Sequence, residues 1–137
     1  MLRTTLLCEV LKERIENLNS DWIQETKKRN GYKTYLNEHA TFKIALGRGS
    51  GHTSLAKAML KEYEDLIVIV PSVCMTDFFE PKDKFTGRVR HIKSLALRGQ
   101  GHLWENKIVI VDVSPVCSKS DIEELKRNMP KCLIILG

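Results

Sequence analysis

The stretch FKIALGRGSGHTSLAKAML, from Phe42 to Leu60, decides the fold. Phe42 to Leu46 has the apolar content of a strand, and three closely spaced glycines follow it. From Thr53 to Tyr63 the apolar residues recur at spacings of three and four, which predicts a helix with Leu55, Met59 and Leu60 facing inward. A strand that enters a helix through a glycine-rich turn is typical of an α/β protein.

Further short apolar runs lie on the carboxyl side of this stretch. LIVIV (66–70), KIVIVD (107–112) and CLIIL (132–136) are unbroken, as expected of strands buried on both faces. A short strand is also possible within 89–94, and a helix from Ser118 or Ser120 to about Met129 is expected before Pro130. We therefore predict an α/β protein with a three-layer αβα arrangement and a mainly parallel sheet of about four or five strands.

The amino-terminal part of the chain is predicted to be helical. In residues 2–18, Leu7, Leu11, Ile15 and Leu18 recur at helical spacing, and Ser20 is a candidate cap for a second short helix. We expect residues 1–40 to form a helical segment that packs on or caps a core of residues 41–137, in a single globular domain overall.

Composition restricts the class of protein. No apolar run approaches the ~20 residues of a membrane span, so we expect no membrane partner and a cytoplasmic location, in host cytoplasm if the protein is viral. The four cysteines lack metal-ligand spacing, and Cys132 is expected in the core. A net charge of +5 favours polyanionic partners, and the basic residues in the middle of the chain are candidates for contact with DNA or RNA: Arg88, Arg90, Lys93 and Arg98. The alternative is that these basic residues form a solvated surface.

The glycine turn has the chemistry of an anion site. Its glycines permit consecutive backbone N–H groups to point at one anion, and the positive end of the following helix adds to this. The pattern G-x-x-x-x-G-K-[ST] is matched only in part, because Leu46 replaces the first glycine and His52 replaces the lysine. The candidate phosphate-binding residues are Gly47, Arg48, Gly49, Ser50, Gly51, His52 and Thr53. The alternative is a strand-to-helix turn without a ligand.

Asp112 is the second candidate residue, because it ends a buried strand at the edge where parallel α/β sheets bind ligands. KIVIVDVSP also resembles the second nucleotide-binding motif, which implies that Asp112 would orient Mg²⁺ opposite the Thr53 hydroxyl. In many hydrolases with this motif the next residue is a glutamate that activates water; here it is Val113, so the catalytic residues are unknown and enzymatic activity is left open. Asp112 could alternatively serve only as a cap at the strand end.

Together, GRGSGHTS (47–54), LIVIV, LALRGQG (95–101) and KIVIVD resemble the P-loop NTPases, and are most similar to the branch containing phage terminases and helicase-type ATPases. Small phage proteins with such a loop are also similar. The resemblance covers residues 42–137 and implies a P-loop fold, ATP or GTP as ligand, Mg²⁺ as cofactor, and Arg98 near nucleotide or nucleic acid. Its departures, Leu46, His52 and Val113, imply weak or absent hydrolysis.

Four hypotheses remain open at the level of sequence. The first is a degenerate nucleotide-binding protein of phage or mobile-element origin, with an accessory role in DNA handling. The second is a nucleic-acid- or protein-binding module that keeps only the fold, using residues 82–98 with Phe85 and Trp104. The third is a working NTPase with a base such as Asp77 or Glu80. The fourth is an interaction protein, such as an inhibitor of a host enzyme.

Overall fold

The computed structural model describes residues 2–44, 52–70, 89–91, 107–112, 123, 125–126 and 130–136. These residues form one sheet with the order β1-β5-β4-β2-β3, and every pairing in it is parallel. The strands are β1 (Thr41–Ile44), β2 (Ile67–Val70), β3 (Val89–His91), β4 (Ile108–Asp112) and β5 (Cys132–Leu136). The predicted α/β class with a mainly parallel sheet is therefore confirmed.

The core of the protein lies in the middle three strands. All of β2, residues 108–111 of β4 and all of β5 except Ile135 are buried. Neighbouring residues of a strand point to opposite faces, so burial of consecutive residues means that both faces of the sheet are covered. The unbroken apolar runs of the sequence are the cause, since an alternating polar residue would have placed one face in water.

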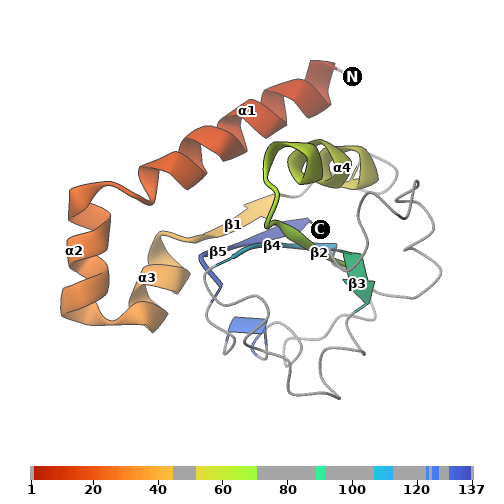
Figure 1. Cartoon of the computed structure of the whole chain (residues 1–137). Coiled ribbons are helices and arrows are strands. Elements are labelled where there is room, and N and C mark those ends of the chain that lie inside the picture. Colours follow the sequence, from red (N-terminus) through yellow and green to blue (C-terminus); the bar gives the residue numbers. More distant parts are fainter. Residues whose placement is uncertain are drawn as a thin grey trace.

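Helices lie on both sides of the sheet, consistent with a three-layer αβα arrangement. Figure 1 shows α4 (His52–Glu62) above the sheet beside α1 (Leu2–Asn17), and a short blue helical piece below it. The chain moves one way across the sheet from β1 to β2 and the opposite way from β4 to β5. Right-handed crossovers then require helices on opposite faces. None of the helices in the described residues is long and apolar enough to cross a membrane.

The helix faces follow the predicted periodicity. Leu55, Met59 and Leu60 of α4 are buried, as expected. In α1, the predicted stripe of Leu7, Leu11, Ile15 and Leu18 faces the core; Leu7 is half-buried and the other three are fully buried, Leu18 just beyond the helix end. The contact between α1 and α4 makes the amino-terminal helix part of the same hydrophobic core as the sheet.

Two further helices extend beyond what the sequence indicated. The second helix, α2 (Asp21–Asn30), is longer than predicted, and residues 32–38, predicted only as a short segment, form α3 (Tyr32–Glu38). Gly31 joins them with a φ of 90°, a conformation that glycine adopts without strain. Ser20 stands at the N-cap position of α2, but its side chain makes no capping hydrogen bond.

Two tyrosines of α3 fasten the amino-terminal segment to the start of β5. The Tyr35 hydroxyl donates to the carbonyl of Lys131 at 2.8 Å, and the Tyr32 hydroxyl donates to that of Pro130 at 2.5 Å. On the other side, the backbone N–H of Lys131 donates to the carbonyl of Lys107 at 2.9 Å. The entry into β5 is thus held between α3 and the residue that precedes β4.

Candidate functional site

One row of residues crosses three strands at the carboxyl edge of the sheet. Ile44 of β1 is in register with Leu136 of β5, which is in register with Asp112 of β4. With about 4.8 Å between neighbouring strands, the backbones at Ile44 and Asp112 are about 10 Å apart. The strand with the predicted metal ligand and the strand that leads into the glycine turn therefore end at the same edge, one strand apart.

The start of α4 belongs to this same edge. The helix begins at His52, eight residues along the chain from Ile44 at the end of β1, and ends at Glu62 near the start of β2. Leu55 and Met59 are buried, so one side of the helix packs on the hydrophobic core that includes the sheet. No acidic residue occurs in its first turn, so the helix does not itself neutralise the partial positive charge of its first N–H groups.

The predicted phosphate-binding residues are described only in part. His52 and Thr53 lie in the first turn of α4, and Asp112 is the last residue of β4. Outside the described residues lie five members of the predicted loop and two positions that depart from the P-loop pattern: Gly47, Arg48, Gly49, Ser50, Gly51, Leu46 and Val113. The structure thus places the strand and the helix that flank the turn, together with the strand of the predicted metal ligand.

Of the predicted nucleic-acid contacts, the structure describes Arg90, at the far edge of the sheet. Arg90 lies in β3, in register with Ile69 of β2, and β3 is the outermost strand on that side of the described sheet. The remaining residues of the basic set and the suggested helpers and bases lie outside the described residues: Arg88, Lys93, Arg98, Phe85, Trp104, Asp77 and Glu80.

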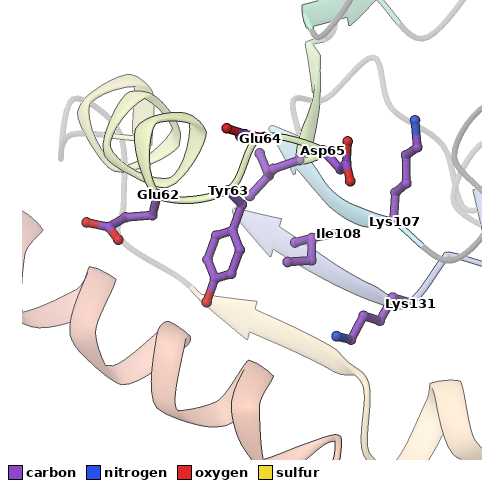
Figure 2. A pocket seen from close by; sticks show the side chains of 8 residues that line it. Glu62, Tyr63, Glu64, Asp65, Lys107, Ile108 and Lys131 are labelled. Carbon is purple, nitrogen blue, oxygen red and sulfur yellow. The ribbon is translucent and has the colours of Figure 1, made fainter.

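A pocket of about 340 Å³ lies at the opposite, amino edge of the sheet, where the α4–β2 connection meets the starts of β4 and β5. It is lined by charged groups of both signs: Glu62, Glu64, Asp65, Lys107 and Lys131. Figure 2 shows these side chains spread in different directions, with Glu62 and Asp65 on opposite sides and Lys107 directed away from Lys131. A ligand site normally has polar groups that converge on one point, so this pocket is a weaker candidate than the carboxyl edge.

Burial changes the acid–base behaviour of groups inside the fold. It raises the pKa of Tyr35 to about 12 and that of Cys132 to about 12, and it also raises the pKa of Tyr32 and of Cys8. These tyrosines and thiols are therefore protonated at neutral pH and serve the fold rather than acid–base chemistry. Among the described residues, no three His, Cys, Asp or Glu side chains gather as a metal site.

A second pocket lies along the outer edge of β1 and was not anticipated from the sequence. It has a volume of about 350 Å³ and lies between β1 and one side of α1. The one sequence signal for it is that Leu6 and Val10 stand outside the buried stripe of α1; they are 58% and 49% exposed.

A scan of protein-family models and searches of curated proteins and of solved structures found no match to this chain.

Proposed function

We propose that this protein binds a nucleoside triphosphate, or a compound with the same phosphate chemistry, at the carboxyl edge of its sheet. The observation that carries the proposal is the row Ile44–Leu136–Asp112, which brings the end of the Asp112 strand within about 10 Å of the strand that enters the glycine turn. A phosphate chain can span that distance with a metal ion at one end. Parallel α/β sheets bind their ligands at this edge.

Two kinds of donor would hold the phosphates. Backbone N–H groups between Gly47 and Gly51 would surround them, and the first turn of α4 at His52 and Thr53 would add its positive end. Arg48 and Ser50 would contribute from the same loop. The acid-free first turn of α4 supports this assignment, because a carboxylate there would repel the ligand.

The residues present fit Mg²⁺ rather than a softer metal. Asp112 and Thr53 offer oxygen donors, and Mg²⁺ binds few protein oxygens while keeping phosphate oxygens and water as its other ligands. When bound, the ion would neutralise charge on the phosphates. Asp112 would hold the ion and Thr53 would orient it from the helix.

Hydrolysis in this proposal is weak or absent. His52 lacks the permanent positive charge that a lysine would carry at neutral pH. Val113 has no carboxylate to activate water. A protein that binds nucleotide and turns it over slowly suits an accessory role in DNA handling, of the kind that the resemblance to phage proteins implies.

Thermal unfolding with and without Mg-ATP or Mg-GTP tests the proposal. A ligand at ten times its Kd stabilises the folded state by about 1.4 kcal/mol, which raises the Tm by about 3–6 °C in a domain of this size. Asp112→Asn should remove most of the Mg-dependent shift. Asp65→Asn, the same change at the amino edge, should leave it intact.

A substitution that should increase the affinity for nucleotide provides a second test of the proposal. His52→Lys should restore the missing charge and lower the Kd for Mg-ATP by about tenfold, as expected for one added ionic contact to phosphate. The proposal fails if millimolar nucleotide leaves the Tm of the unchanged protein and of His52→Lys at the same value as buffer.

The alternative, a nucleic-acid-binding module, is favoured by the position of Arg90 on an outer strand of the sheet. It is tested by DNA and RNA binding at several salt concentrations, because phosphate contacts give an affinity that falls steeply with salt. Arg90→Glu together with Arg88→Glu should abolish such binding, whereas Gly51→Ala should not.

A further inference from the structure

The outer edge of β1 presents backbone hydrogen-bonding groups in a defined pattern. The N–H of Leu133 donates to the carbonyl of Ala40 at 2.8 Å, and Thr41 is in register with Leu133. In a parallel ladder, alternate residues bond to the same neighbour, so Ala40, Phe42 and Ile44 face β5. The N–H and C=O groups of Thr41 and Lys43 therefore point away from β5. No strand in the described part of the chain pairs with that side.

This edge is the floor of a groove of about 350 Å³. One wall is α1, which contributes Leu7, Val10 and Leu11 at helical spacing, and the other lining residues are Thr41–Ile44 with Arg14. Val10 is half exposed although it is apolar, and Leu6, one turn earlier on α1, is more exposed still. The groove thus combines an open sheet edge with apolar side chains, the two features by which a domain accepts an added strand.

The charged side chains that line the groove are all positive. Arg14 and Lys43 line it and are both exposed, and no carboxylate is among its described lining residues. The nearby Lys12 does not belong to this set, because it pairs with Glu62 at 3.2 Å and with Glu9 at 3.5 Å. A strand placed against β1 would therefore meet two cations that have no anion within the groove lining.

We propose that this groove binds an extended, acidic segment of another protein by adding a strand to the edge of β1. Its backbone would bond to Thr41 and Lys43, its apolar side chains would contact Leu7 and Val10, and its carboxylates would pair with Arg14 and Lys43. A second copy of this chain fits less well. Pairing of two β1 edges would bring the Arg14 and Lys43 cations of both copies to one interface, and like charges close together destabilise such pairing.

A labelled peptide tests the proposal with the protein of residues 1–137. The probe is a fluorescein-labelled peptide with a core of alternating valine and threonine and an aspartate at each end. Anisotropy should show binding that weakens by about tenfold or more in Arg14→Glu and in Lys43→Glu. Lys28→Glu makes the same change in net charge at an exposed site on α2 and should bind as the unchanged protein does.

Rescue and backbone controls separate the proposal from general attraction between charges. Lysines in place of the peptide aspartates should restore binding to Lys43→Glu and prevent it for the unchanged protein. Methylation of alternate peptide amides should abolish binding, because it removes the donors to the β1 edge. Equal loss in Lys28→Glu, tight binding of the methylated peptide, or no binding of the probe would overturn the proposal. So would sedimentation showing a dimer that Lys43→Glu dissociates, since the occupant would then be a second copy.

Discussion

The hydroxyl of Tyr35 is expected to contribute measurably to folding because it ties the amino-terminal helices to the central sheet. Tyr35 is 1% exposed, and its hydroxyl donates to the carbonyl of Lys131, 96 residues away in sequence. That carbonyl stands at the entry to β5, the strand that separates β1 from β4. Tyr35→Phe removes the donor and leaves the ring in place, so it changes the hydrogen bond with little change in packing.

The expected loss of stability is about 1–1.5 kcal/mol. A buried hydrogen bond between uncharged groups contributes about 1 kcal/mol net, and an acceptor left without a partner costs about 1–3 kcal/mol. Lys131 is only half-buried, so water can reach the region and the loss should lie at the lower end. In a domain of this size that loss lowers the Tm by about 3–6 °C.

Urea unfolding followed by circular dichroism is the assay. The midpoint should fall while the dependence on denaturant stays unchanged, because the area exposed on unfolding is the same. Tyr32→Phe should behave similarly, and the double variant should be non-additive by more than about 0.5 kcal/mol, since the two rings lie 6.0 Å apart and bond to consecutive carbonyls. Trp22→Phe, at a side chain 63% exposed, is the control and should stay within about 0.5 kcal/mol. A change of under about 0.3 kcal/mol in Tyr35→Phe would refute the reasoning.

Three further outcomes are expected. The stability of the fold should decrease as the pH rises from about 10 towards 12, because an unfolded tyrosine loses its proton near pH ~10 while folded Tyr35 keeps it to about 12. Thermal unfolding should show a smaller decrease in Tm over this range in Tyr35→Phe, and an equal decrease would contradict the raised pKa of Tyr35. Ile110→Val, at a fully buried position of β4, should cost about 1 kcal/mol in urea unfolding, and the half-buried Ile135→Val should cost less; the reverse order would contradict the observed burial. Cys8 and Cys132, both buried thiols, should resist alkylation at pH 8 in the folded protein and react after unfolding, as read by site-resolved mass spectrometry; rapid native labelling of Cys132 would contradict its placement in the core.

The strands could be predicted from the sequence because a strand that is buried on both faces has an unbroken run of apolar residues. LIVIV and CLIIL contain no polar residue, and the structure places them as β2 and β5 within a residue of the predicted ends. The helix α2 was underestimated because the residues of its second half, such as Lys27 and Lys28, carry no apolar periodicity. That half lies at the surface and needs no buried stripe.

The strand order could not be predicted, because parallel pairing joins segments far apart in sequence and several orders satisfy right-handed crossovers. In this order only β5 separates β1 from β4, the strand that ends at Asp112. The same order makes β1 an edge strand, so the backbone groups of Thr41 and Lys43 face outward. The residues of the candidate site could therefore be predicted from the sequence, but their arrangement in space could not. The groove at Arg14 and Lys43 was missed because α1 and β1 meet only in the folded chain.

Titration of the isotope-labelled protein with Mg-ATP, followed through its backbone amide NMR signals, tests the central claim most directly. Binding at the carboxyl edge should shift the signals of His52, Thr53 and Asp112 in a saturable manner and leave those of Lys107 and Lys131 at the amino edge unchanged. Shifts confined to Lys107 and Lys131, or no saturable shift at millimolar Mg-ATP, would contradict the claim that phosphate binds where β1 and β4 end.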